Sequence, residues 1–191
     1  MCGQKIKDLD VNFMLRGQIY AGSSIEDKNA LGGFASSNHT PKKIRLRDDF
    51  EKNGFYIKID TSKIIVLAEK YNGYKLYIIN KSKDIVELNA SDSRLYMIAE
   101  AFIDGKWKPI EYLPSSFCGN SYHRVLINSN EYWDFDVPRF SGKIKTKIRY
   151  RLGLENNKYI YSNEISASIN KKQLTQKQGY NSKGLMDPYI D

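Results

Sequence analysis

The sequence contains few residues of the kinds that form disulfide frameworks or metal sites. Among its 191 residues there are two cysteines and two histidines. Two cysteines do not make the disulfide framework of a small secreted domain. Apart from Cys118 and His123, these four residues lie far apart in the chain, so the spacing of zinc ligands is missing. We therefore expect no metal and no other cofactor.

Long apolar runs are also missing. No stretch approaches the roughly 18 consecutive apolar residues of a membrane-spanning helix, so we expect no transmembrane segment. Hydrophobic residues make up 41% and charged residues 27%, as in ordinary soluble globular proteins. The length suffices for one domain with a full core, with or without an extension.

Basic and aromatic residues, by contrast, are plentiful. The formal net charge is +8, which favours anionic partners such as acidic proteins, anionic glycans or lipid head groups. A basic balance is also a common solution to solubility, so the charge alone does not define a partner. Aromatic residues make up 13%, and 14 of them are tyrosines, which suit half-buried sheet surfaces.

The first residues, "MCGQK", lack the charged and apolar regions of a complete signal peptide. They resemble the mature start of a bacterial lipoprotein, in which Cys2 would carry the lipid. Two alternatives stay open. A signal peptidase would cleave before Gln4, or the chain is cytosolic and the early cysteine is incidental.

Short runs rich in Ile, Val, Tyr and Phe alternate with turn residues along most of the chain, for example at Asn72-Gly73. No stretch has a convincing helical pattern. Six to eight strands spaced by turns predict an all-β fold, an antiparallel sandwich. We expect an N-terminal extension of strands and a Gly/Ser-rich loop over 1–55, the sandwich over 56–170, and a polar tail over 171–191.

The clearest predicted hairpin is "LYMIAEAFIDGKWKPIEYL". Asp104 and Gly105 form a strong two-residue turn signal, because both tolerate positive φ. This register places Phe102 opposite Trp107, and we expect the pair to lie in the core. Pro109 predicts that its strand lies at a sheet edge or ends there.

A second strand, "EYWDFDV", alternates after a turn at 128–130. Glu131, Trp133, Phe135 and Val137 share one face. Asp134 and Asp136 lie on the other face with Tyr132. Paired carboxylates can act as acid and base, but two on one strand face more often only keep that face solvated.

The sharpest feature is the strand "KIKTKIRYRLGL". Its alternation points Ile144, Thr146, Ile148, Tyr150 and Leu152 inward. Five cations point outward together: Lys143, Lys145, Lys147, Arg149 and Arg151. We predict that this row binds an anionic partner. Alternatively it only solvates the strand and discourages edge pairing, or Asp134, Asp136 and Glu164 neutralise it. On this outward face no aromatic residues are interleaved with the cations, so single-stranded nucleic acid in particular is disfavoured and nucleic acid is not an expected partner.

The stretch "KIRYRLGLENNKYIYSNEISASI" resembles the last two strands of a fibronectin type III or immunoglobulin-like module. That resemblance implies an immunoglobulin-like sandwich, although the Cys…Trp…Cys spacing of antibody domains is absent. The excess of Lys, Asn, Ile and Tyr, with "GKWKPIEYLPSSFCGNSYH", resembles exported proteins of Bacteroidota. This second resemblance implies an exported protein, periplasmic or associated with the outer membrane; a cytoplasmic protein is the alternative.

The stretch "SSFCGNSYH" brings a thiol and an imidazole close in sequence. A nucleophile and its base need mutual contact, a third orienting group and a lowered thiol pKa. The sequence supplies no helix N-terminus and no assignable orienting residue near Cys118 and His123. We therefore favour a structural loop, with Phe117 or Cys118 in the core, and expect no enzyme. A cysteine-dependent enzyme stays as the second alternative.

These observations together favour a non-enzymatic binding or structural module of the bacterial cell envelope, a candidate lipoprotein subunit of an outer-membrane assembly. The expected partner is an envelope protein. The first alternative is a protein that binds a polyanion or glycan.

Overall fold

The computed structural model describes residues 5–48, 50, 53–116 and 118–178, and within these ranges the chain is all β. Three short 3-10 helices are the exceptions: η1 (Gly119–Ser121), η2 (Glu155–Asn157) and η3 (Lys171–Leu174). The strands, in chain order, are β1 (Leu9–Asp10), β2 (Leu15–Arg16), β3 (Lys42–Lys43), β4 (Phe55–Leu67), β5 (Tyr71–Asn80), β6 (Val86–Ser91), β7 (Arg94–Leu95), β8 (Met97–Ile103), β9 (Lys106–Pro109), β10 (Glu111–Tyr112), β11 (Tyr122–Ile127), β12 (Glu131–Pro138), β13 (Phe140–Ser141), β14 (Ile144–Gly153), β15 (Tyr159–Tyr161) and β16 (Ile165–Ile169). The predicted all-β class is confirmed.

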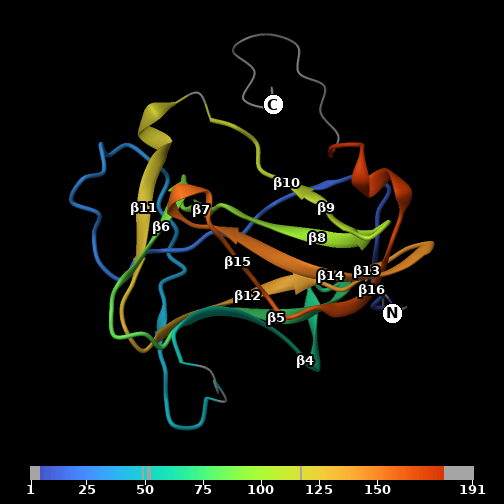
Figure 1. Ribbon diagram of the computed structural model, residues 1–191, viewed down its shortest axis with the longest axis horizontal. Helices are drawn as coiled ribbons and strands as arrows, with labels where there is room; N and C mark the ends of the chain where they lie inside the picture. The colour runs from blue at the N-terminus through green and yellow to red at the C-terminus, as the bar shows by residue number, and fades with distance from the viewer. Residues whose placement is uncertain (1–4, 49, 51–52, 117, 179–191) are drawn as a thin grey trace.

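Two antiparallel sheets form the body of the molecule, with the core between them (Figure 1). One has the strand order β3-β12-β5-β4. The other has the order β15-β14-β8-β9, and β16 pairs with β14 next to β15. A third, smaller sheet, β11-β6-β7, contributes Leu88 and Val125 to the same core.

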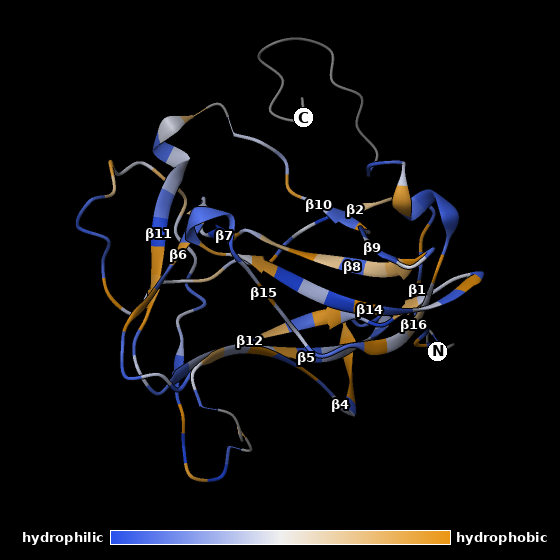
Figure 2. Cartoon of the chain, in the orientation of Figure 1, coloured by the Kyte–Doolittle hydropathy of each residue, from blue (hydrophilic) through white to orange (hydrophobic). Residues whose placement is uncertain are grey.

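The alternation of side chains explains why these segments are strands. In β12 the side chains of Trp133, Phe135 and Val137 are buried, whereas Asp134 and Asp136 lie on the other face, as predicted. Along β14, hydrophilic residues alternate with less hydrophilic ones (Figure 2). A strand with one apolar face gains its stability by burying that face against a second sheet.

The N-terminal segment pairs with two short strands outside the main sheets and takes part in the core. Strand β1 pairs in parallel with β13, and β2 pairs in parallel with β10. Ile19 and Ala21 belong to the core cluster, and the indole Nε1 of Trp133 donates a hydrogen bond to the carbonyl of Gly22 at 3.0 Å. The proposed boundary at residue 55 stays a prediction, but these contacts join the segment to the sheets.

The first residues of the predicted tail are also attached to the rest. Gln173, in η3, is fully buried, and Lys177 forms a parallel bridge with Met14. The boundary at residue 170 likewise stays a prediction. Residues 179–191 lie outside the described part of the chain.

The hairpin between β8 and β9 forms as predicted. Asp104 and Gly105 have φ angles of 53° and 75°, and Phe102 is paired with Trp107. Strand β9 lies at the edge of its sheet, as Pro109 predicted. Proline has no backbone N–H to donate, and at an edge strand that donor is not needed for pairing on the outer side.

The turn predicted at Asn72-Gly73 is wrong, because both residues lie inside β5. The chain turns earlier, where Ala68 and Glu69 have φ angles of 46° and 58°. Gly73 is needed for another reason. A Cβ atom there would lie 2.5 Å from Cδ1 of Leu67 and 2.6 Å from the carbonyl oxygen of Val137. The glycine permits a close approach between strands. From the sequence alone, an Asn-Gly pair needed for this reason cannot be told from one that forms a turn.

Candidate binding face on the five-stranded sheet

Strand β14 directs one row of side chains into the core and the opposite row away from it. Ile148, Tyr150 and Leu152 are buried as predicted, with exposed fractions of 1%, 1% and 0%. Ile144 and Thr146 are only half-buried, because they lie towards the end where β16 alone is the registered partner. The outward row consists of Lys143, just before the strand, and then Lys145, Lys147, Arg149 and Arg151.

The two arginines of this row share one buried carboxylate. Glu100, on the neighbouring strand β8, has a side chain that is only 7% exposed. Nε and Nη2 of Arg149 donate hydrogen bonds to its Oε2 at 3.1 and 2.9 Å, and Nε of Arg151 lies 2.7 Å from its Oε1. A buried carboxylate needs such partners, because without them its desolvation is uncompensated. Arg149 and Arg151 therefore have a structural role.

Aromatic rings surround the same arginines. Cζ of Arg149 lies 4.2 Å from the ring centroid of Trp107 and 3.8 Å from that of Tyr161. Cζ of Arg151 lies 4.5 Å from the centroid of Tyr159. These distances are typical of cation–π contacts. The expectation that no aromatic residues accompany the cations is therefore wrong, because the rings come from β9 and β15.

The pair of Phe102 and Trp107 also lies on this outward face. Their centroids are 5.2 Å apart, but Phe102 is 43% exposed. The expected core position is therefore wrong, whereas the expected pairing is confirmed. The reason is the strand period: Phe102 shares a face with Glu100, and the core side of β8 is taken by Ala99 and Ala101.

The three lysines of the row are more exposed than the arginines. Nζ of Lys147 lies 2.9 Å from Oε2 of Glu164, as one of the alternative interpretations expected. Within the described ranges, no ion pair joins Lys143 or Lys145 to an acidic residue. Among the described residues of the row, these two lysines keep their charge open to solvent.

Asp134 and Asp136 do not neutralise the row. They lie on the other main sheet, where Lys75 pairs with both and Lys42 pairs with Asp134. Burial acts to raise the pKa of Asp134, but the hydrogen bonds from Lys42 and Lys75 outweigh it and lower that pKa below its ordinary value. The two aspartates thus belong to a separate ion-pair network.

The structure does not join Cys118 and His123 as a nucleophile and base. Cys118 is exposed, so the expectation that it packs in the core is wrong; Phe117 lies outside the described residues. His123 lies in β11, and its imidazole has other partners. Its Nε2 accepts a hydrogen bond from the backbone N–H of Ser93 at 2.9 Å, and its ring stacks on Phe34 at 3.7 Å. The imidazole therefore holds two loops together.

Sequence reasoning missed Glu100 and the aromatic residues beside the arginines. The alternation of the β8–β9 hairpin places Glu100 and Phe102 on one face, which was a usable signal. What the sequence did not indicate was that β8 pairs with β14, with Arg149 opposite Glu100. Pairing between strands about 50 residues apart depends on the whole fold.

Lipidation, membrane spanning and metal binding are the remaining points raised by the sequence. Cys2, the predicted lipidation site, lies outside the described residues. Over the ranges that the structure covers, no helix is long and apolar enough to cross a membrane. The same ranges hold no cluster of three or more residues suited to a metal ion.

Comparison with known proteins adds no assignment. No protein-family model, curated protein or solved structure matches the chain. The face on β14 must therefore be interpreted from its own chemistry.

Proposed function

We propose that this chain is a non-enzymatic binding module of the bacterial cell envelope, and that the outward face of β14 binds an acidic surface of a partner protein. One observation carries the proposal. Lys143 and Lys145 are exposed without an acidic partner in the described part of the chain, on the same strand whose arginines are held in place. Exposed cations on a rigid strand attract anionic partners and orient them.

The arginines support this proposal indirectly. Glu100 and the rings of Trp107 and Tyr161 restrain Arg149, so the strand presents its lysines from a fixed base. A surface that is already ordered loses less conformational entropy when it binds a partner. The lysines are thus the recognition elements of the proposal, and the arginines are the support.

An anionic glycan is the second candidate partner. The observation in its favour is that Tyr159 and Tyr161 expose 43% and 44% of their surface on the arginine-bearing half of the face. Exposed aromatic rings offer apolar surfaces on which the C–H faces of sugar rings can pack. Cations beside such rings would pair with carboxylate or sulfate groups.

The fold supports a further part of the proposal, that the module resembles fibronectin type III or immunoglobulin domains. In its favour, two antiparallel sheets face each other, and β14 pairs antiparallel with the segments that follow it, although these form two strands, β15 and β16, and not one. The parallel pairs β1–β13 and β2–β10 are additions to such a module. An experimental structure whose strand order differs from that of these domains would contradict the proposed resemblance.

A binding experiment with two defined probes tests the proposed face. The full chain is titrated with polyglutamate, which stands for an acidic protein surface, and with heparin, which stands for a sulfated glycan. The test variant is Lys143→Glu with Lys145→Glu. The control is Lys63→Glu with Lys83→Glu, which makes the same charge change at exposed lysines of other segments.

The two variants give distinguishable results. We expect the test variant to lose affinity and the control to keep it, with a steep dependence on salt, because exposed charges are screened over about 8–10 Å at physiological ionic strength. Preference for heparin over polyglutamate would select the glycan. Equal losses in both variants would show unspecific charge attraction and contradict the proposal.

The envelope location has its own test. Fractionation of cells that express the natural chain should place it with the membranes, and Cys2→Ala should release it if a lipid holds it there. Recovery of the natural chain in the cytosolic fraction would contradict this part of the proposal and leave the binding face untouched.

A further inference from the structure

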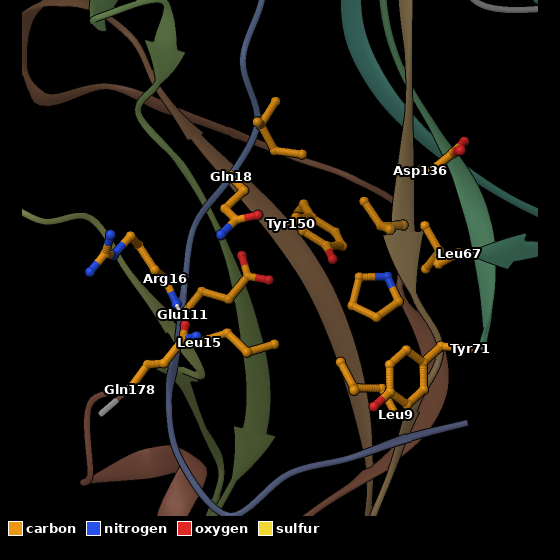
Figure 3. A pocket seen from close by; sticks show the side chains of 13 residues that line it. Leu9, Leu15, Arg16, Gln18, Leu67, Tyr71, Glu111, Asp136, Tyr150 and Gln178 are labelled. Carbon is orange, nitrogen blue, oxygen red and sulfur yellow. Dashed lines mark hydrogen bonds between the residues drawn. The ribbon is translucent and has the colours of Figure 1, made fainter. Parts of the chain in front are cut away.

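A cavity of about 320 Å³ lies on the core side of β14, opposite the proposed binding face. Apolar side chains from the N-terminal segment, the end of β4 and β12 form much of its wall: Leu9, Leu15, Ile19, Leu67 and Val137. Its volume lies near the lower end of the range of small-molecule sites, roughly 300–1,000 Å³. Figure 3 shows these elements around the space.

A buried hydroxyl group points into this cavity without a hydrogen-bond partner. Tyr150 is 1% exposed, and its hydroxyl has no partner among the described residues. An unsatisfied buried hydroxyl costs about 1–3 kcal/mol. A phenylalanine would fill the same core position without that cost. The hydroxyl is therefore best explained by a molecule that binds to it.

A buried carboxyl group lies on the same cavity wall. Glu111, in β10, is 7% exposed, and its Oε2 accepts a hydrogen bond from the backbone N–H of Ala99 at 2.9 Å. Burial raises the pKa of Glu111 to about 7, so near neutral pH a large fraction is the uncharged acid. In Figure 3 the carboxyl of Glu111 and the hydroxyl of Tyr150 point toward the same space.

We propose that this cavity binds a small, uncharged, mainly apolar molecule that carries a hydroxyl group. Its apolar body packs against the leucines, and its hydroxyl forms hydrogen bonds with Tyr150 and Glu111. An uncharged ligand fits because Arg16 and Asp136, which also line the cavity, have opposite charges. The proposal does not depend on the binding face, since Tyr150 and the lysines project from opposite sides of β14.

The experiment uses two probes that differ only by the hydroxyl group, 2-naphthol and naphthalene. Each is titrated into the full chain and followed by amide NMR, in which the N–H of Ala99 reports on Glu111 directly. We expect 2-naphthol to shift the Ala99 amide and to bind about five- to tenfold more tightly than naphthalene, the effect of one added hydrogen bond.

Three variants locate the binding. Tyr150→Phe removes the hydroxyl and should abolish the preference for 2-naphthol. Leu15→Trp fills the cavity and should abolish binding of both probes. Tyr122→Phe removes a hydroxyl from an exposed ring in β11 that does not line the cavity, and it should leave both affinities unchanged, which makes it the matched control.

Several outcomes would overturn the proposal. These are failure of both probes to bind, equal affinity for the two probes, an unchanged preference in Tyr150→Phe, or binding that persists in Leu15→Trp while the Ala99 amide stays unmoved. If Leu15→Trp does not fold, Tyr150→Phe decides alone, because it removes only a hydroxyl that has no partner among the described residues.

Discussion

Arg149, in β14, donates two hydrogen bonds to a single oxygen of Glu100, which is its partner residue in the neighbouring strand β8. This pair divides the outward row of β14 into two parts. At the Arg149 end the positive charges of the arginines are paired with the carboxylate of Glu100. At the Lys143 end the charge faces solvent. The five cations are equally spaced in the sequence, but the arginines are structural and the lysines near Lys143 are available to a partner.

Charge reversal should separate the two parts by their effects on stability. Arg149→Glu would place a second carboxylate beside buried Glu100, so we expect it to lower the free energy of unfolding by about 3 kcal/mol or more. Lys145→Glu, the matched control on the same strand, should change it by less than about 0.5 kcal/mol. Urea denaturation measures both. Similar small effects would show that the Glu100 pair contributes little.

The pH dependence of stability should show the effect of burying Glu111. Its pKa is about 7 in the folded protein and 4.5 for the ordinary group, so the folded state binds the extra proton between these values. Stability should therefore fall as pH rises from 4.5 to 7, by about 3 kcal/mol if this group acts alone. Below pH 4.5 the full stability is present, because Glu111 is protonated in both the folded and the unfolded state. Above pH 7 the decrease in stability is complete, because Glu111 is ionised in both states.

Glu111→Gln provides the test of that assignment. The glutamine oxygen can still accept the N–H of Ala99, but the side chain no longer titrates. We expect this variant to be more stable than the natural chain at pH 8 and to lose much of the slope between pH 5 and 7. Thermal unfolding across pH measures the difference. A slope that survives the substitution would have to come from other groups.

His123 and Cys118 should differ sharply in their importance for folding. His123→Ala removes the acceptor of the Ser93 N–H and the ring that stacks on Phe34, so we expect a loss of about 1–3 kcal/mol. Cys118→Ser changes an exposed side chain and should cost less than about 0.5 kcal/mol. Denaturant midpoints compare them. If Cys118→Ser proved the more damaging, the structural role assigned to His123 would be in doubt.

Gly73 should tolerate no side chain. The methyl group of Gly73→Ala would clash with Leu67 and with the backbone of Val137, so we expect a loss of about 1–3 kcal/mol. Gly119→Ala is the control, since a Cβ there meets nothing within 4 Å. Equal stability of the two variants would mean that β5 can shift away from β12 at little cost.

The amino-acid sequence predicted features that depend on neighbours in the chain. The turn at Asp104-Gly105, the pairing of Phe102 with Trp107 and the two faces of β12 all follow from local preference and a period of two residues. Such patterns are informative because one face of each strand must be buried. They predicted the outward row of β14 for the same reason.

Features set by distant contacts could not be predicted in this way. Phe102 and Trp107 were expected in the core because both are large and apolar, but the period of β8 assigns the core side to alanines. Glu100 meets its arginines only when β8 lies beside β14. The cavity at Tyr150 needs the N-terminal segment as a wall, and no local pattern indicates where that segment lies.

The pairing of the N-terminal segment also bears on how the chain folds. Leu9 pairs with Phe140, and Met14 forms a bridge with Lys177, so this segment pairs with residues that lie far along the chain. Contacts of such high sequence separation slow folding, because a long loop must be closed before they form. Until these pairs form, the apolar side chains of the N-terminal segment stay exposed, and a partly folded chain in that state is prone to aggregate.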